Sequence, residues 1–135
     1  MNAIVKEEYK YSGITGKIIG CAMEVHRILG CGFQEVIYQR ALAYEMQLLD
    51  IPFAREFEMP VIYKDFQAGT RRVDFLVEGK ISVELKAVTK MEPVNLAQAI
   101  NYLEAYNLEI GLLINFGSTK LEFHRFENKK FKPEL

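Results

Sequence analysis

The sequence has little net charge, few cysteines and no long apolar run. Its 17 Lys and Arg residues nearly balance its 18 Asp and Glu residues, so the formal charge is −1. Any contact with nucleic acid must therefore come from a local patch and not from a global positive field. The longest apolar runs, such as residues 110–114, are far shorter than the roughly 18 residues of a membrane span. No basic segment followed by an apolar one opens the chain, and we expect a cytoplasmic protein without membrane contact.

The two cysteines, Cys21 and Cys31, are too few and too far apart to suggest a disulfide framework or a C-x-x-C zinc site. Cys21 falls within an apolar helical stretch, so we expect it in the core. Cys31 lies between two glycines. There it is either a reactive thiol or, since no motif accompanies it, a small residue that fills a turn.

The length and composition predict one globular domain. The chain has 135 residues, of which 50% are hydrophobic and 26% charged, and it contains no internal repeat or low-complexity tract. We expect a single domain over residues 1–135, with a core over about residues 14–126.

Two helices are predicted at the start of the chain, over about residues 14–29 and 34–49, because apolar residues recur there at three- and four-residue steps. Gly30-Cys31-Gly32 separates them, since glycine supplies the left-handed backbone that ends a helix. The stripe expected to be buried on the first helix is Ile14, Ile18, Cys21, Ala22, Val25 and Leu29. The stripe expected on the second is Val36, Ile37, Ala41, Tyr44, Glu45 and Leu48.

After Pro52 the apolar period changes to two, which predicts three short strands over residues 57–63, 72–77 and 81–88. The connecting turns are expected at residues 64–69 and 78–80, and Pro60 indicates an edge strand or a bulge. A helix over about residues 93–106 follows, with Leu96, Ala99, Ile100 and Leu103 on its apolar face. Residues 110–115 read as a strand buried on both faces, and residues 121–125 as a final strand.

The middle hairpin contains the residues that could carry out a reaction. A three-residue turn over 78–80 pairs Val77 with Ile81, Phe75 with Val83 and Asp74 with Glu84. That register buries the apolar partners together and places Asp74, Glu84 and Lys86 on one face. A shift by one residue would oppose Phe75 to Glu84, which costs apolar burial.

Adjacent carboxylates on a sheet repel each other unless a cation neutralises them, and oxygen ligands of this kind suit Mg²⁺ or Mn²⁺. A neighbouring lysine can orient an attacking water and stabilise a phosphoryl transition state. The other interpretation is that Asp74, Glu84 and Lys86 form cross-strand salt bridges on a solvated face.

Asp74, followed by Glu84-Leu85-Lys86 across a hairpin, resembles the D…(D/E)-x-K signature of the PD-(D/E)xK nuclease superfamily. Upstream, Gly32-Phe33-Gln34-Glu35-Val36-Ile37-Tyr38 reads G-x-x-E-x-x-Y. With Val25-His26-Arg27 before this motif and residues 112–117 after it, the chain is similar to the GxxExxY family of that superfamily. The match extends from about residue 14 to 125. Val73 stands where the superfamily name has proline, as in many members.

The resemblance implies an α/β fold with a restriction-endonuclease-like α-β-β-β-α-β core. A mixed sheet would be flanked by helices, with an extra N-terminal helix and a C-terminal strand. Asp74 and Glu84 would bind Mg²⁺ or Mn²⁺ together with the Leu85 carbonyl, and Lys86 would serve the nucleophilic water. Glu35 would be a further ligand, directly or through water; otherwise it is an ordinary acidic residue at a helix N-terminus.

Other residues have two interpretations each. Gln98 and Tyr102 resemble the Q-x-x-x-Y element of the exonuclease-like branch and would contact the substrate backbone or Lys86; alternatively, Tyr102 packs and Gln98 is solvated. His26 is either a metal ligand, as in some branches, or structural. The basic residues expected to contact phosphate, or otherwise to form solvated surface, are Arg72, Arg55, Arg71, Lys80, Lys90, Lys129, Lys130 and Lys132.

The sequence favours a metal-dependent nuclease-like hydrolase that acts on DNA through an activated water. The first alternative is a non-catalytic module on the same fold that binds nucleic acid or protein. The second, a small-molecule or structural α/β domain, is disfavoured by the intact signature. Exposed strands at the ends of the sheet would also allow a homodimer.

Overall fold

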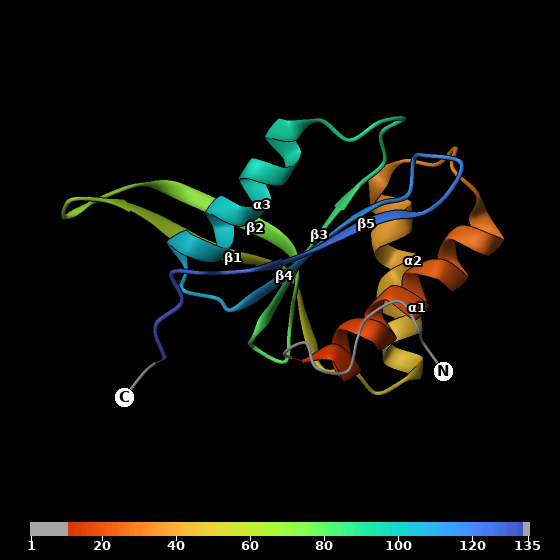
Figure 1. Cartoon of the computed structure of the whole chain (residues 1–135), viewed down its shortest axis with the longest axis horizontal. Coiled ribbons are helices and arrows are strands. Elements are labelled where there is room, and N and C mark those ends of the chain that lie inside the picture. The colour runs from red at the N-terminus through yellow and green to blue at the C-terminus, as the bar shows by residue number, and fades with distance from the viewer. Residues whose placement is uncertain (1–10, 134–135) are drawn as a thin grey trace.

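The computed structural model describes residues 11–133, in which helices flank a five-stranded sheet (Figure 1). The element order is the one predicted from the sequence. The elements are α1 (Ser12–Leu29), α2 (Glu35–Leu48), β1 (Phe53–Tyr63), β2 (Phe66–Val77), β3 (Ile81–Lys86), α3 (Pro93–Ala105), β4 (Ile110–Asn115) and β5 (Glu122–Glu127).

The sheet is mixed, with its strands in the order β1-β2-β3-β4-β5. Pairs β1–β2, β2–β3 and β4–β5 are antiparallel. Strands β3 and β4 are parallel, and α3 makes the crossover that a parallel pair requires. This arrangement confirms the predicted α/β class.

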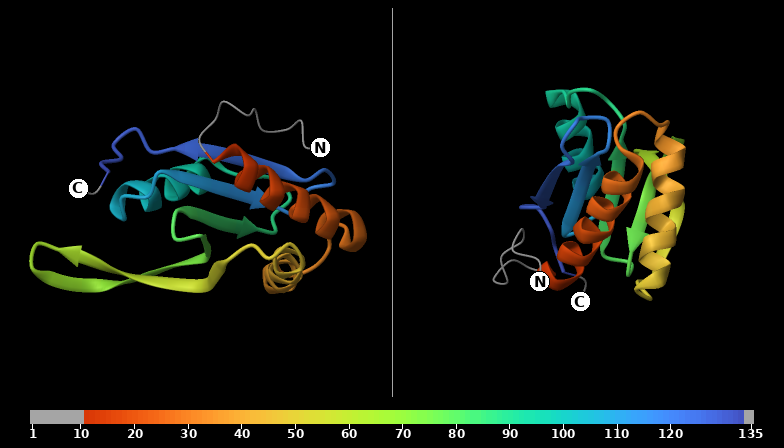
Figure 2. Two further views of the ribbon diagram at one scale, coloured as in Figure 1. Left: turned by 90° about the horizontal axis from the view of Figure 1, so that it is seen from below. Right: turned by 90° about the vertical axis from the view of Figure 1, so that its right-hand side faces the viewer.

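The helices lie on both faces of the sheet. Val83 and Leu85 of β3 pack with α1 and α2 in the main core, whereas Leu113 of β4, in register with Glu84, packs with Met91 and Ala99 on the α3 side. Figure 2 shows α1 and α2 next to each other and crossing at an angle, since its left view looks along α2 but shows α1 lengthwise. All of β4 is buried, as predicted, and Cys21 is a core residue, whereas Cys31 is exposed. None of the helices within residues 11–133 is long and apolar enough to span a membrane.

The buried face of α2 differs from the predicted one. The residues that face the core are Tyr38, Gln39, Leu42, Ala43 and Met46. Val36, Ile37, Tyr44 and Leu48, which were predicted to be buried, are exposed. Apolar residues occupy both sides of this helix, so their spacing alone does not decide which side meets the sheet.

The first hairpin is much longer than predicted. Strands β1 and β2 have 11 and 12 residues, and the expected loop at residues 64–69 is reduced to Lys64 and Asp65 between the strands. Residues 67–70 are polar or small yet continue β2, because a ladder needs backbone groups and not apolar side chains. The outer part of this hairpin, residues 59–70, is called the arm; it extends away from the body of the molecule (Figures 1 and 2). The edge position predicted from Pro60 is confirmed, since β1 is the first strand of the sheet.

The ends of β3 and β4 are fastened together by Asn115. Its side chain accepts a hydrogen bond from the Val88 N–H at 3.0 Å and donates one to the Val88 carbonyl at 2.8 Å. The chain then passes so close to β3 that a Cβ atom on Gly117 would lie 2.3 Å from the Val88 nitrogen. Only glycine fits at this position without a shift of the backbone.

This close approach generates a prediction for stability. Replacing Gly117 by Ala should lower the free energy of unfolding by about 1–3 kcal/mol, because the added methyl group meets backbone atoms that cannot rotate away. Gly20→Ala is the control, because Gly20 lies within α1 with open space around its Cα, and it should gain about 0.5–1 kcal/mol. Urea denaturation of both variants and the wild type measures this, and equal stability of Gly117→Ala and the wild type would contradict the close approach.

Candidate functional site

Strands β2 and β3 separate next to Asp74 and Glu84, the two acidic residues of the predicted site. Their pairing covers Phe75–Val77 and Ile81–Val83, with Phe75 opposite Val83 and Val77 opposite Ile81, which confirms these two predicted pairs. The predicted pair of Asp74 and Glu84 is not part of the ladder, which ends one residue earlier. Beyond Phe75, β2 continues with β1 into the arm. Asp74 and Glu84 are the next residues on the two strands, so they lie in the fork between them.

Both carboxylate oxygens of Asp74 are oriented by hydrogen bonds. The Leu85 backbone N–H donates to Oδ2 at 2.8 Å, where a ladder bond between β2 and β3 would otherwise continue. The Gln39 side chain, buried on α2, donates from Nε2 to Oδ1 at 2.8 Å. Each oxygen keeps a further lone pair, so Asp74 can still bind a cation.

The backbone of β1 is irregular directly beside Asp74. Arg55 is opposite Phe75 and Phe57 is opposite Val73, while Glu56 between them has φ 55°, in the left-handed region. A non-glycine residue in this region costs free energy and is most common where the surrounding structure imposes it, often near functional sites.

Glu84 is a largely buried carboxylate with incomplete pairing. Its Oε1 atom is buried and has no hydrogen-bond partner, and the nearest cation, Arg71 Nη2, lies 3.6 Å away. Burial raises the pKa of Glu84; the Asp74 charge adds to this, whereas Arg71 and Lys86 oppose it. An unsatisfied buried oxygen of this kind would be satisfied by a cation.

Arg71 is held by α3 and not by Glu84. It donates from Nη1 to Asn101 Oδ1 at 2.8 Å and from Nη2 to the Gln98 carbonyl at 2.6 Å. Its guanidinium lies over the Tyr102 ring at 5.1 Å. These contacts fix the positive charge just beyond hydrogen-bond reach of Glu84.

The two α3 residues from the Q-x-x-x-Y resemblance have different surroundings. Tyr102 is buried beneath Arg71, and burial raises the pKa of its hydroxyl to about 12. The side chain of Gln98 is exposed, and its backbone carbonyl is what holds Arg71. In the absence of substrate, both residues therefore support Arg71.

Lys86 and Glu35 complete the electrostatic surroundings. Loss of contact with water raises the pKa of Glu35, as do the charges of Asp74 and Glu84, while Lys86 acts in the opposite direction. Within residues 11–133, no hydrogen bond or salt bridge occupies the Lys86 ammonium group. The three acidic residues thus interact through their charges, with Lys86 as a cation that is available to a further ligand.

Tyr38 explains why Glu35 is placed here. The Tyr38 hydroxyl donates to the Gly30 carbonyl at 2.6 Å and accepts from the Phe33 N–H at 3.1 Å. Its ring stacks on Phe116 with 4.7 Å between centroids. The tyrosine of the G-x-x-E-x-x-Y motif therefore fastens the α1–α2 turn to the sheet and sets the first turn of α2, where Glu35 lies.

Two sequence candidates have partners other than Asp74, Glu84 and Glu35. Arg72 is exposed and its nearest acidic group is Glu56, at 3.9 Å. His26 Nε2 lies 3.0 Å from the Ser118 carbonyl, an arrangement that fits the structural interpretation of this histidine.

The sequence interpretation missed Gln39 and the particular position of Arg71. A signal for Gln39 was present, since it follows Glu35 by four residues and so shares its helix face. Arg71 had been considered only as one of several phosphate contacts. Strand alternation places Arg72, not Arg71, on the side of Asp74, so no sequence signal indicated the contact with Glu84.

The donor atoms fit a divalent cation that prefers oxygen. No group of three or more His, Cys, Asp or Glu side chains within residues 11–133 is gathered closely enough to hold a metal ion by itself. Two carboxylates with water are nevertheless a common protein contribution to a Mg²⁺ site. The unsatisfied Glu84 Oε1 and the oriented Asp74 carboxylate supply such a pair.

The comparisons with known proteins agree with this geometry. Among solved structures, the fold is similar to "Crystal structure of SSO0001", with a TM-score of 0.54 and 17% sequence identity over 69% of this chain. The chain spans 50% of that protein's chain. A search of curated proteins finds no match.

A family model described as the PD-(D/E)XK nuclease superfamily matches residues 12–126, a range that contains the fork and all its flanking elements. The α/β fold with its mixed sheet is the restriction-endonuclease-like fold of such proteins. The chain belongs to the PD-(D/E)XK nuclease superfamily.

Proposed function

We propose that this protein is a metal-dependent deoxyribonuclease of the GxxExxY type that hydrolyses phosphodiester bonds in the fork between β2 and β3. The observation that carries the proposal is the pairing of an oriented carboxylate, Asp74, with the unsatisfied buried oxygen of Glu84. Arg71 makes a 3.6 Å ion pair with Glu84 but gives its short hydrogen bonds to α3, so Glu84 Oε1 keeps an unsatisfied lone pair.

In this proposal Asp74, Glu84 and the Leu85 carbonyl hold Mg²⁺ or Mn²⁺, with Glu35 acting through water. Held by these residues, a divalent ion would supply Lewis acidity toward a phosphoryl oxygen and a water molecule. Gln39 and the Leu85 N–H keep the Asp74 carboxylate in one orientation. Lys86, two residues after Glu84 on β3, orients the attacking water and stabilises negative charge on the phosphate.

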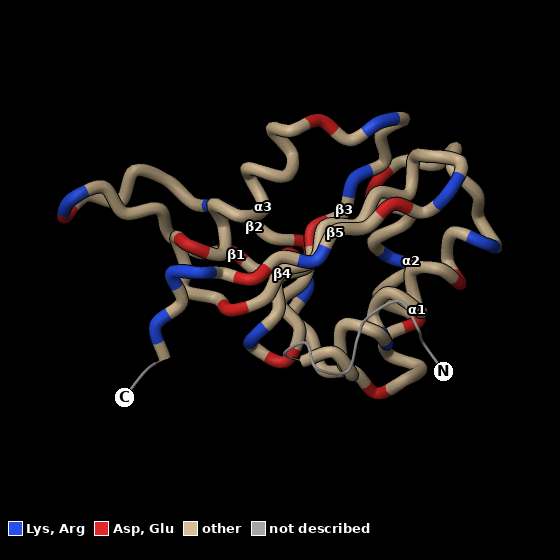
Figure 3. The backbone as a smooth tube through the Cα atoms, viewed as in Figure 1, with Lys and Arg blue, Asp and Glu red and all other residues tan. Residues whose placement is uncertain are grey.

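DNA is the proposed substrate, held mainly by its phosphates. Arg71 lies 3.6 Å from Glu84 and is thus the basic residue best placed to meet a phosphate near the acidic pair. Gln98, Tyr102 and Arg72 are the further proposed contacts. Lys and Arg are interspersed with Asp and Glu along the backbone (Figure 3), so binding should be weak and sensitive to salt.

The decisive assay incubates the purified protein with single-stranded, linear duplex and branched DNA, in Mn²⁺, Mg²⁺ or EDTA. Cleavage that requires the cation supports the proposal and identifies the substrate form. DNA binding without cleavage in any of these conditions would favour the non-catalytic module.

Lys86→Met should reduce cleavage by about 100- to 1,000-fold, because removing one group that stabilises transition-state charge has roughly this effect. Mn²⁺ affinity should change little, since the lysine acts on water and phosphate. Lys120→Met, at an exposed lysine in the β4–β5 connection, is the control and should retain full activity. Equal residual activity of the Lys86→Met variant and the wild type would point to a contaminating nuclease.

Gln39→Ala should weaken Mn²⁺ binding by about 10- to 100-fold, because groups that orient a metal ligand have effects of this size. Gln47→Ala, at an exposed glutamine on the same helix, should leave the affinity unchanged. Calorimetric titration with Mn²⁺ compares the two variants. If Gln39→Ala binds the ion as the wild type does, the hydrogen bond to Asp74 has no role in metal binding.

Glu84→Gln tests the acidic pair without substrate. In EDTA it should be at least as stable as the wild type, since burial raises the pKa of Glu84 and ionisation therefore opposes folding. Below the ordinary glutamate pKa, Glu84 of the wild type is protonated and does not oppose folding. As the pH rises through the raised pKa of Glu84 in the folded protein, the side chain ionises and the free energy of unfolding falls. The advantage of the variant should thus be larger at pH 8 than at pH 4.

With Mn²⁺ bound, the wild type should be more stable than Glu84→Gln. At about 100 times its dissociation constant, the ion should add roughly 2.7 kcal/mol to the wild type, or about 8–13 °C in melting temperature. Glu84→Gln should lose most of that gain. Thermal melts with Mn²⁺ and with EDTA measure both effects, and a wild-type melt that does not respond to the ion would contradict the proposed site.

A further inference from the structure

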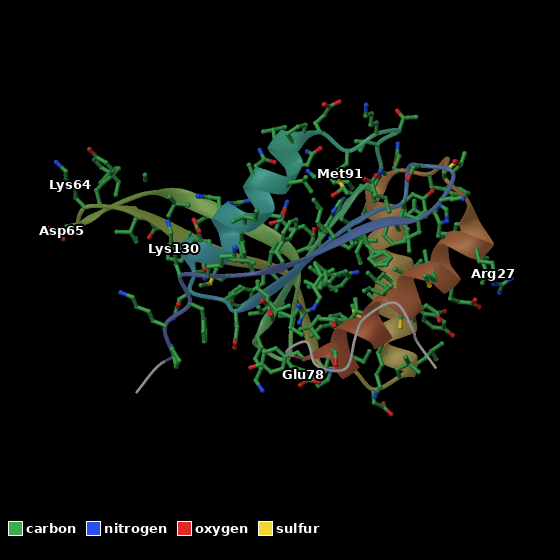
Figure 4. All side chains as sticks on the ribbon, in the orientation of Figure 1. Arg27, Lys64, Asp65, Glu78, Met91 and Lys130 are labelled. Carbon is green, nitrogen blue, oxygen red and sulfur yellow. The ribbon has the colours of Figure 1, made fainter. Side chains whose placement is uncertain are left out.

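The arm exposes large apolar side chains. None of residues 59–70 is buried, and Ile62, Tyr63 and Phe66 are 57%, 63% and 67% exposed. Tyr63 and Phe66 are cross-strand partners beside the tip, which consists of Lys64 and Asp65. Figure 4 shows these two charged residues at the far end of the arm.

Exposing the apolar side chains of the arm to water costs free energy. A two-stranded hairpin by itself is only marginally stable in water, because it has no face on which to bury its apolar side chains. A cluster of exposed apolar side chains on a protein of this size usually belongs to an interaction surface. The arm therefore has the properties of a segment that another surface covers.

A groove beside the arm has matching properties. It has a volume of about 470 Å³, and it is lined by residues 59–62 of the arm and by Asn101, Ala105 and Tyr106 at the end of α3, with Arg71 in its wall. Asn101 and Arg71 are hydrogen-bonded to each other at 2.8 Å, so these polar lining groups already have a partner. The groove can thus accept an apolar side chain without leaving those groups unpaired.

We propose that the occupant of this groove is the arm tip of a second copy of this chain. In a two-fold symmetric dimer, each Tyr63–Phe66 pair would insert into the partner's groove, so the tip and the groove of one chain are both used.

The charge of the arm disfavours nucleic acid as the occupant. Lys64 and Asp65 are the sole charged residues among residues 59–70, so the arm has no net charge with which to bind phosphates. The available area fits a small protein interface. Val61, Ile62, Tyr63 and Phe66 together expose roughly 400 Å² per copy, and with the groove walls the total approaches the lower limit of about 1,200 Å² for stable interfaces.

Sedimentation velocity from micromolar to submillimolar protein tests the proposal independently of nuclease activity. The wild type should reach twice the monomer mass of 15.6 kDa. The tip variant Tyr63→Lys/Phe66→Lys and the groove variant Ala105→Arg should remain monomeric. Their circular dichroism should match that of the wild type, because the altered positions are exposed.

The matched control is Tyr44→Lys/Leu48→Lys on α2. These two side chains are as exposed as the tip, at 60% and 59%, but lie on another element. This control should dimerise as the wild type does. If it abolishes the dimer while the tip variant retains it, the interface lies on α2 and the proposal is wrong.

Disulfide trapping locates the contact. In a Cys31→Ser background, Gln67→Cys protein mixed with Ala105→Cys protein should form a cross-linked pair under mild oxidation, whereas Gln47→Cys mixed with Ala105→Cys should not. A wild type that stays monomeric at every concentration overturns the proposal. If the wild type is monomeric and the variant Tyr63→Lys/Phe66→Lys binds DNA less well than the wild type, the tip is a nucleic-acid contact and the proposal is wrong.

Discussion

The end of pairing between β2 and β3 at Phe75 is the constraint on which the site depends. Beyond it the two strands separate, and the Leu85 N–H loses the ladder partner that it would have in a continuous sheet. The Asp74 carboxylate accepts that hydrogen bond instead, at 2.8 Å. A side chain thus replaces a backbone acceptor, which holds the carboxylate in the opening and lets β2 turn away into the arm. The irregular backbone at Glu56 lies beside this same position.

The charges in the fork are balanced incompletely. Arg71 is close enough to attract Glu84 but is bound to α3 by shorter hydrogen bonds. Leaving one buried oxygen without a hydrogen bond costs about 1–3 kcal/mol. The hydrogen bonds from Arg71 to α3 leave the buried Glu84 Oε1 atom without a hydrogen bond.

Particular residues show how far the sequence could predict this structure. Alternating Val73, Phe75, Val77 and Ile81, Val83, Leu85 specified the hairpin register, because only one pairing buries them all. The buried side of α2 was predicted wrongly, since Tyr44 and Leu48 are as apolar as the residues that face the core. The position of Arg71 depends on how β2 turns after it leaves β3. That path results from tertiary packing against α3 and has no counterpart in the periodicity of the sequence.

Strand β2 connects the arm to Asp74, and this continuity has a mechanical consequence. Arg71 lines the groove beside the arm and is also the cation nearest to Glu84, only three residues from Asp74. A surface that fills the groove would pack against Arg71 and against the α3 residues that hold it. Such packing would restrict the guanidinium near Glu84. A contact in the groove would therefore reach the acidic pair through the single side chain of Arg71.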